Sequence, residues 1–285
     1  MGIHGHGSRK LGLRPHSPGR NGISLAWAKG QVPIHPPKSD HLTGWVFGMD
    51  GNDQFGVCGP TSVDNHRRMT TKLLTPLEED ATLEQVFDLY RRSGNPSFDP
   101  ATGADDNGVE MAAMADAVNK GGIAGVQTMA FARLQDTSDA SIAAAIHVFG
   151  GVLLAVTLES AQQSQTDAGT WAYQRSPLWG GHAIVCGAYD ETTGFMDVVT
   201  WAQRVKTTAG FRQHQLDEVW LPIWPELVSS GRFFDSGVDT ARFSNDFKIL
   251  TGQKFPVAPL DAGRIIIDMN THNIVVPADW TTSTR

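Results

Sequence analysis

The stretch of sequence that decides the fold is residues 51–62, GNDQFGVCGPTS. It reads as a glycine-rich turn that ends at Cys58, and apolar residues at helical spacing predict a helix over residues 61–74. Cys58 therefore stands at or just before a helix N-terminus, where the helix dipole and free backbone N–H groups favour a thiolate and can hold a developing oxyanion. A lone cysteine is more often a small buried hydrophobe, but this position makes Cys58 a candidate nucleophile.

A nucleophilic cysteine needs a base, and the sequence favours His182. His66 lies eight residues beyond Cys58 on the same predicted helix, about 12 Å along its axis, which is too far to act. His182 follows Gly180 and Gly181 and opens a predicted strand, so its imidazole is left accessible. The second cysteine, Cys186, lies in the middle of that strand and is predicted to be structural.

The strand that begins at His182 is predicted to form an antiparallel hairpin. Residues 182–189 and 195–201 are rich in strand-forming residues, with a turn at residues 190–194 between them. Asp197 and Thr200 on the second strand are within reach of the imidazole, on opposite faces. Either side chain is a candidate to orient His182, as a catalytic base requires.

The remaining pattern predicts an α+β fold, because helices dominate the first half and strands the second. Thr82–Gln85 resembles a capping box that starts a helix. Further elements are predicted as helices over residues 109–119, 139–149 and, for the most part, 213–228, as strands over 123–134 and 152–158, as a polar loop over 160–179, and as a hairpin of 264–268 with 273–276. The rest of residues 229–285 is predicted to be irregular.

Two sets of acidic residues are predicted to have structural roles rather than to bind a metal or act in catalysis. Asp99, Asp105, Asp106 and Glu110 do not have the spacing of a calcium loop, and we expect a solvated acidic loop. Asp217 and Glu218, expected in the last turns of a helix, are predicted to form salt bridges rather than to act as catalytic acids.

Composition excludes several classes of protein. The chain has 285 residues, a net charge of −7 and a pI near 5.8, which argues against nucleic-acid binding. Two cysteines exclude a disulfide framework and a cysteine-rich zinc site, and no phosphate-binding loop or dinucleotide fingerprint is present, so we expect no cofactor and no metal. No run of 18 apolar residues and no secretory signal occurs, so we expect no membrane partner and a cytoplasmic location, or a virion location if the protein is phage-encoded.

The N-terminal region differs in charge from the rest of the chain. Residues 1–48 hold six Lys/Arg and one acid, a net +5, which leaves −12 for the remainder. Residues 1–45, rich in Gly, Pro and His, are predicted to be an extended arm that makes few contacts with its own core. We expect the arm to lie on a neighbouring subunit or in a larger assembly, although the same charges would also favour wrapping around its own domain. The predicted organisation is thus an arm at 1–45, a domain at 46–228 and an extension at 229–285.

The order of these motifs resembles a known family. Cys-Gly-Pro-Thr-Ser at residues 58–62, followed by Gly-His-Ala at 181–183, is similar to the papain-like cysteine peptidase superfamily and to its branch that includes the bacteriocin-leader peptidases. Strings at 51–53, 122–125, 145–151, 180–183, 199–201 and 217–218 also resemble uncharacterised papain-like proteins of bacteria and their phages. The resemblance covers residues 45–228.

The resemblance implies a helical half carrying Cys58, packed on an antiparallel β half carrying His182. In the family a side-chain amide helps to bind the oxyanion, and its position corresponds to either Asn52 or Gln54 in this sequence. Where the family has an asparagine that orients the histidine, this sequence has Val199, which cannot hydrogen-bond. If Trp201 corresponds to the tryptophan that follows this asparagine in the family, the nearest residue that could replace the asparagine is Thr200. Its hydroxyl is a weaker hydrogen-bond partner for the imidazole.

Two functions follow from these expectations. The first is a thiol hydrolase, a cysteine peptidase or amidase, in which Cys58 attacks a peptide or other amide and His182 transfers the proton. The alternative is a catalytically weak or inactive papain-like scaffold with an assembly role, such as a phage virion protein. The paired Cys58 and His182 favour the first function, whereas the missing asparagine and the basic arm favour the second. If they form a catalytic pair, the sulfur should lie about 4–5 Å from a ring nitrogen.

Overall fold

The computed structural model describes residues 9–17, 22–74, 80–256, 266–268 and 273–275. Its centre is a mixed sheet of nine strands in the order β1-β3-β9-β4-β6-β7-β8-β5, with β2 added on β6. Most neighbouring strands are antiparallel, except β1 with β3 and β5 with β8. The strands are β1 Ile23–Leu25, β2 Lys38–Asp40, β3 Ala130–Leu134, β4 Val152–Glu159, β5 Thr170–Trp171, β6 Leu178–Asp190, β7 Phe195–Thr200, β8 Gln203–Thr207 and β9 Leu216–Ile223.

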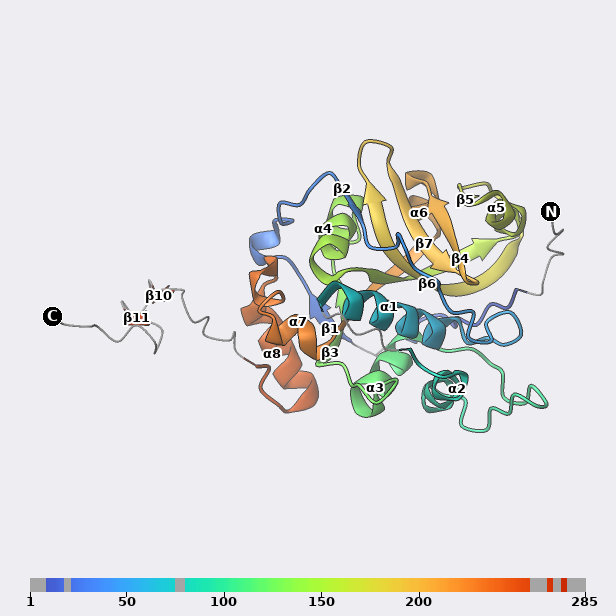
Figure 1. Ribbon diagram of the computed structural model, residues 1–285, viewed down its shortest axis with the longest axis horizontal. Helices are drawn as coiled ribbons and strands as arrows, with labels where there is room; N and C mark the ends of the chain where they lie inside the picture. Colours follow the sequence, from blue (N-terminus) through green and yellow to red (C-terminus); the bar gives the residue numbers. More distant parts are fainter. Residues whose placement is uncertain (1–8, 18–21, 75–79, 257–265, 269–272, 276–285) are drawn as a thin grey trace.

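The helix that begins at the candidate nucleophile lies at the centre of the molecule. α1 (Cys58–Leu74) crosses between the sheet on one side and α2 (Leu83–Arg92) and α3 (Met111–Gly121) on the other (Figure 1). Because it is covered on both sides, every residue from 58 to 71 is buried, including the polar ones. This arrangement gives the predicted α+β fold, with a helical part that carries Cys58 packed on a β part that carries His182.

The remaining helices cover the sheet and one end of the molecule. Their bounds are α4 Asp139–Phe149, α5 Ala161–Ala168, α6 Ala209–Gln215, α7 Pro225–Ser229 and α8 Thr240–Thr251. Among the residues described, no helix is both long enough and apolar enough to cross a membrane. The capping box at the start of α2 is confirmed, since the Thr82 hydroxyl accepts from the Gln85 amide and the Gln85 side chain returns to the Thr82 N–H.

Two local predictions are wrong for tertiary reasons. The helix expected over residues 213–228 is largely β9, which is inserted between β3 and β4 with Pro222 opposite Phe131. Its residues from 218 to 223 are all buried, and sheet pairing therefore overrides the helical spacing. The loop expected over residues 160–179 contains α5 and β5.

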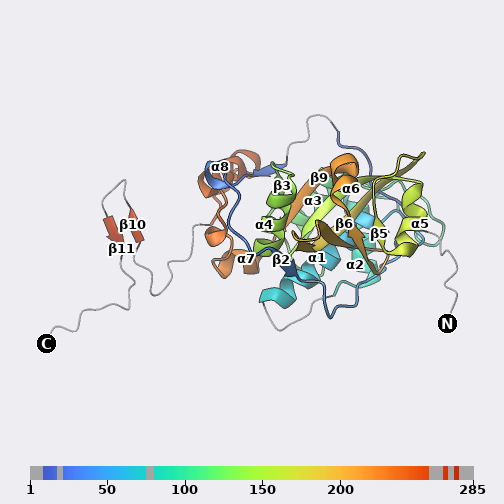
Figure 2. The same ribbon diagram turned by 90° about the horizontal axis from the view of Figure 1, so that it is seen from above.

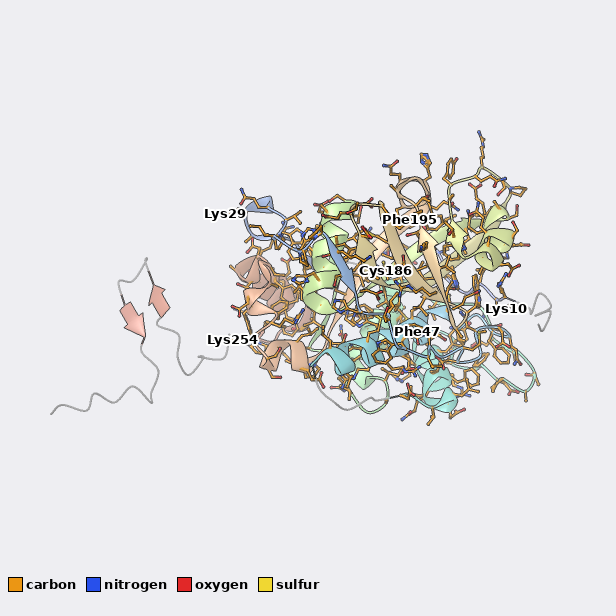
Figure 3. The ribbon with its side chains drawn as sticks, turned by 45° about the horizontal axis from the view of Figure 1, so that its top comes forward. Lys10, Lys29, Phe47, Cys186, Phe195 and Lys254 are labelled. Atoms are coloured by element: carbon orange, nitrogen blue, oxygen red, sulfur yellow. The ribbon has the colours of Figure 1, made fainter. Side chains whose placement is uncertain are left out.

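The described residues of the C-terminal part are more regular than predicted. The hairpin is confirmed, since β10 (Ile266–Asp268) pairs antiparallel with β11 (Asn273–Val275). Residues expected to be irregular instead form α8, at the end of the molecule where Lys254 is labelled (Figures 2 and 3). α8 is held by aromatic rings that pack against one another, namely Phe233, Phe243, Phe247 and Phe255.

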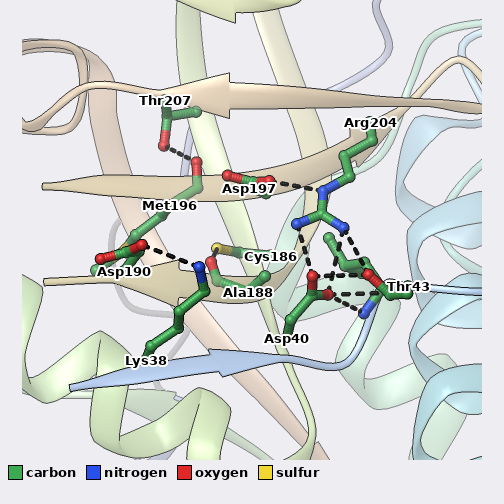
Figure 4. Close-up of polar contacts among 11 residues, drawn as sticks. Lys38, Asp40, Thr43, Cys186, Ala188, Asp190, Met196, Asp197, Arg204 and Thr207 are labelled. Atoms are coloured by element: carbon green, nitrogen blue, oxygen red, sulfur yellow. Dashed lines mark hydrogen bonds and ion pairs between the residues drawn. The ribbon is translucent and has the colours of Figure 1, made fainter. Parts of the chain in front are cut away.

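The expectation that the arm makes few contacts with its own core is wrong. β1 pairs with β3 and β2 pairs with β6, so the arm supplies two strands to the sheet. Four of its apolar residues, Ile23, Leu25, Trp27 and Leu42, are buried, whereas Ile34 is exposed. Figure 4 shows Arg204 joining Asp40 of the arm to Asp197 of β7. An arm cation is also paired with a carboxylate of the body, Lys38 with Asp190 at 3.1 Å, so the described arm residues form ion pairs within their own chain.

Candidate active site

Cys58 is the first residue of α1 and is completely buried. Its Sγ accepts a hydrogen bond from the backbone N–H of Ala183, 3.4 Å away, which brings the start of α1 against the residue after His182. Burial raises the pKa of the thiol to about 11, although backbone groups of Ala183, Gly12 and Gly59 oppose that rise. In this buried position Cys58 is therefore a protonated thiol.

His182 is fixed on β6 by two neighbours. Its Nε2 lies 2.7 Å from the Thr200 hydroxyl, and its ring stacks on the Trp201 indole with centroids 4.3 Å apart and 13° between the planes. Its Nδ1 is buried and has no hydrogen-bond partner in the described part of the chain. Burial lowers the pKa of the imidazole to about 3, so the ring is neutral. When Nε2–H is donated to Thr200, Nδ1 is left with a lone pair that can take a proton.

The ring of Trp201 is held over His182 by an unusual turn. Trp201 and Ala202 connect β7 to β8, and both have positive φ, 45° and 56°. Two consecutive positive φ values are those of a type I′ hairpin turn, which normally uses Asn or Gly. The indole N–H is bonded to the Lys10 carbonyl of the arm, 3.3 Å away.

The expected contact between Thr200 and His182 is present, and Asp197 is engaged elsewhere. The Asp197 carboxylate lies 2.6 Å from Nε of Arg204 and is largely buried. Asp197 is therefore not solvated, because strand β8 places a cation beside it. His66, which the sequence places too far from Cys58 to act as its base, is a buried residue whose two ring nitrogens are bonded to the Gly151 carbonyl and the Trp224 indole.

The two candidate oxyanion amides differ in their surroundings. Asn52 is buried, and its Oδ1 has no hydrogen-bond partner in the region that the structure describes. Gln54, two residues later, is exposed. Both cysteines are free, and Cys186 is buried in the middle of β6, where its label stands near the centre of Figure 3.

A segment of the arm lies directly across this site. The Leu13 N–H is bonded to the Gly181 carbonyl at 3.1 Å. On its other side, Val109 N–H donates to the Gly12 carbonyl and Arg14 N–H to the Val109 carbonyl, both at 2.7 Å. The arm is thus held as a short strand between the helical part and β6. No feature of the sequence alone predicted this placement.

A cavity of about 550 Å³ adjoins this segment. It is bounded by Leu13–His16 of the arm, by β4, by Gly180 and Gly181 of β6, and by Asp217 and Glu218. The latter two lie on β9 rather than on a helix, and Glu218 forms the predicted salt bridge, with Arg133 at 3.4 Å.

The acidic loop is not fully solvated, contrary to expectation. Asp106 accepts hydrogen bonds from the Gly56 N–H and the Tyr90 hydroxyl, and Glu110 is buried at the start of α3. These two carboxylates face inward because they organise the glycine-rich turn and the arm. Among the described residues, no group of three potential ligands is placed to hold a metal ion.

A central helix that begins at a cysteine, packed on an antiparallel sheet that presents a histidine to it, is the papain-like cysteine protease fold. Among solved structures, the chain is similar to xylellain, a cysteine protease from Xylella fastidiosa, with a TM-score of 0.60, 12% identity, and coverage of 75% of this chain and 96% of that one. It is also similar to proCathepsin B S9 from Trypanosoma congolense, with a TM-score of 0.56, 9% identity, and coverage of 75% and 86%. At these identities the likeness concerns the fold alone. No family model and no curated protein matches the sequence.

Proposed function

We propose that this protein is a thiol hydrolase of peptide or amide bonds, with Cys58 as nucleophile and His182 as general base. The observation that carries the proposal is the convergence at the start of α1. Cys58 Sγ is held by the amide of Ala183, and the neighbouring His182 is fixed through Nε2 while its Nδ1 has no partner among the described residues. A nucleophile, a base and a group that orients the base are the three parts that thiol catalysis requires.

In the proposed reaction, the Cys58 thiol gives its proton to His182 Nδ1 and the sulfur attacks the carbonyl carbon of the substrate. His182 then protonates the leaving amine as the C–N bond breaks and an acyl-enzyme forms. Water, deprotonated by the same imidazole, hydrolyses the thioester and restores the thiol. Thr200 keeps the ring oriented throughout, and Trp201 excludes water from one face of the ring.

The oxyanion of the tetrahedral intermediate would be bound at the N-terminus of α1. The backbone N–H of Cys58 is one donor, because the first N–H groups of a helix have no intrahelical partner. Burial favours Asn52 over Gln54 as the second donor, since a buried amide is pre-oriented whereas an exposed one must be ordered.

The form described here is closed, because the arm covers the sulfur. Burial by the arm contributes to the raised thiol pKa and the lowered imidazole pKa, and both shifts disfavour a thiolate–imidazolium pair. A substrate must therefore displace residues 9–17 before it reaches Cys58. Displacement admits water to the pair and moves both pKa values back toward their ordinary ranges.

The alternative proposal is a papain-like scaffold with an assembly role, such as a virion component. Thr200, a weaker orienting group than a carboxylate or an amide, favours it. The arm no longer supports it, since the described arm residues pack on their own domain. Assembly through the arm and a cytoplasmic or virion location remain predictions.

The two functions separate in one experiment on the full chain. The experiment uses the Gly12→Ala variant, a substitution in the arm that is designed to release the arm from Cys58. The variant is treated with iodoacetamide at pH 6. It is separately incubated with a peptide mixture that is then analysed by mass spectrometry. A hydrolase should show alkylation at Cys58 but not at buried Cys186, and new peptide termini that disappear in Cys58→Ser. A chain whose Cys58 becomes accessible yet yields no Cys58-dependent termini would be a scaffold. Alkylation of Cys186 would reveal unfolding.

A further inference from the structure

One carboxylate ties the glycine-rich turn before Cys58 to the helical part of the fold. Asp106 Oδ1 accepts hydrogen bonds from the Gly56 N–H and the Tyr90 hydroxyl, both at 2.8 Å. Gly56 stands two residues before Cys58, and Tyr90 is a completely buried residue of α2. Asp106 itself lies in the loop between α2 and α3, and its side chain is 11% exposed. The contact therefore exists only in the folded chain.

Gly56 is the link between two short segments that the backbone already closes. Residues 51–55 form one hydrogen-bonded turn, and residues 57–61 form the first turn of α1. A glycine does not restrict its own φ and ψ, so the residue alone does not fix how one turn is set against the other. The bond from the Gly56 N–H to Asp106 supplies that restriction.

The carboxylate is itself held in place by Tyr90. The Tyr90 hydroxyl accepts the Gly108 N–H at 2.6 Å while it donates to Asp106. Burial, and then the bond to Asp106, raise the pKa of this hydroxyl, so it remains a donor. The second oxygen of Asp106 faces Lys10 of the arm, with Nζ 3.9 Å away. The bonds that fix the turn use the first oxygen, so they do not depend on the arm.

The two candidate oxyanion donors stand on opposite sides of Gly56. The Asn52 side chain belongs to the turn at residues 51–55, and the Cys58 N–H belongs to the turn at residues 57–61. Such donors stabilise an oxyanion only when both lie at hydrogen-bond distance from it, and a displacement of about 1 Å is costly. The relative placement of the two donors is thus set at Gly56.

We propose that Asp106 is a positioning residue for the oxyanion site, acting through the N–H of Gly56. Asp106 does not touch the substrate; it keeps Asn52 and the Cys58 N–H aimed at one point. This inference rests on the proposed hydrolase function and on these two donors. It assigns a catalytic consequence to a loop carboxylate that is far from Cys58 in the sequence.

The first test is kinetic and uses the full chain with Gly12→Ala as the parent. Asp106→Asn keeps an oxygen that can accept both bonds, whereas Asp106→Ala removes it. The Ala variant should lose about tenfold or more in kcat with less than about threefold change in KM, and the Asn variant should retain most of the activity. Asp99→Ala is the matched control, because that carboxylate bonds Ala101 and Thr102 of its own turn. Equal kcat for the Asn and Ala variants would overturn the role of Asp106.

The second test separates positioning from general damage to the nucleophile. Iodoacetamide alkylates Cys58 without forming an oxyanion. A peptide aldehyde does form one, because the sulfur bonds to the aldehyde carbon, the carbonyl oxygen takes the negative charge and His182 holds the thiol proton. Asp106→Ala should weaken aldehyde capture about tenfold or more while the alkylation rate stays within about twofold of the parent. An equal fall in both would overturn the proposal.

The outcomes distinguish this inference from the proposed function. Aldehyde capture that depends on Asp106, without Cys58-dependent hydrolysis, overturns the hydrolase and retains the positioning role. Hydrolysis that is indifferent to Asp106 does the reverse, and a chain that is alkylated at Cys58 but neither hydrolyses nor captures overturns both.

A second variant covers the case in which Asp106→Ala does not fold. Amides of the ladder between β4 and β6 report folding by hydrogen exchange. If their protection is lost, Tyr90→Phe decides, because it removes the hydroxyl that holds Asp106 and leaves the carboxylate in place. Its aldehyde capture should fall about threefold with alkylation of Cys58 unchanged. Unchanged capture would overturn the proposal.

Discussion

A β-carbon placed on Gly12 of the arm would lie 1.9 Å from the carbonyl oxygen of Gly56 in the glycine-rich turn. Gly108 approaches the same segment from the other side, where its β-carbon would lie 2.3 Å from the Gly12 carbonyl oxygen. Since both neighbours are backbone atoms, neither can move aside without shifting the chain. The arm therefore reaches Cys58 only because residue 12 is glycine.

Gly12→Ala should release the arm and expose Cys58. The clash leaves the sheet and α1 intact, so we expect alkylation of Cys58 to accelerate about tenfold or more, as for the loss of about 1.4 kcal/mol of docking free energy. Gly210→Ala is the matched control, because a β-carbon there would meet its nearest atoms at 3.9 Å. An unchanged alkylation rate in Gly12→Ala would show that Gly12 does not control access.

Thr200→Val should reduce catalysis without unfolding the protein. Valine keeps the shape of threonine but removes the hydroxyl bonded to His182 Nε2, so the imidazole loses its orientation. In the open Gly12→Ala chain we expect a fall in kcat on the order of 10²-fold with little change in KM. Thr200→Ser, which keeps a hydroxyl, should retain most of the activity. Equal rates for the Val and Ser variants would remove Thr200 from the proposed mechanism.

Asp64→Asn should stabilise the protein at neutral pH more than in acid. Burial is the main cause that raises the pKa of Asp64 to about 7, above its usual value of 3.8. A group whose folded pKa is raised adds stability below its unfolded pKa, and that stability is lost as the pH rises to the folded value. Compared with the Asn variant, the wild-type chain should thus lose unfolding free energy between about pH 4 and 7.

The measurement is urea unfolding of both chains at several pH values. The Asn variant keeps an oxygen that can accept the Ala81 N–H now bonded to Asp64, so the comparison isolates the charge. The same substitution at exposed Asp88 is the control. A stability difference that is flat from pH 4 to 8 would contradict the prediction.

Glu226→Gln should destabilise the fold through Arg67. The Arg67 side chain is 1% exposed, makes two bonds of 2.7 and 2.9 Å to Glu226, and lies over the Trp224 ring. Loss of the carboxylate removes the charge that this buried guanidinium faces in both bonds, at a cost of roughly 2 kcal/mol or more. Urea unfolding measures this cost, and a loss below about 0.5 kcal/mol, the range of ordinary surface substitutions, would contradict it.

Local sequence determined the parts of the site that depend on near neighbours. The glycine-rich turn and the apolar spacing after it place Cys58 at the start of a helix, and the pattern after Gly181 places His182 on a hairpin whose second strand carries Asp197 and Thr200. These features follow from backbone preferences and from side-chain periodicity, which act over a few residues. They were sufficient to predict the fold class, but they left both Asp197 and Thr200 open as partners of His182, and only the resemblance to the papain-like family favoured Thr200.

Tertiary structure decided what depends on residues far apart in the chain. The segment 216–223 was predicted to be mostly helical but is a strand, because it pairs with β3 on one side and β4 on the other, where residues 218–223 are all buried. The arm is polar and basic, yet it docks on its own domain, because Gly12 fits against Gly56 and because Glu110 and Glu218 lie 3.8 and 3.5 Å from His16 Nδ1. Neither the close fit nor the carboxylate pair exists until α3 and β9 are in place, so no local pattern in the sequence records them.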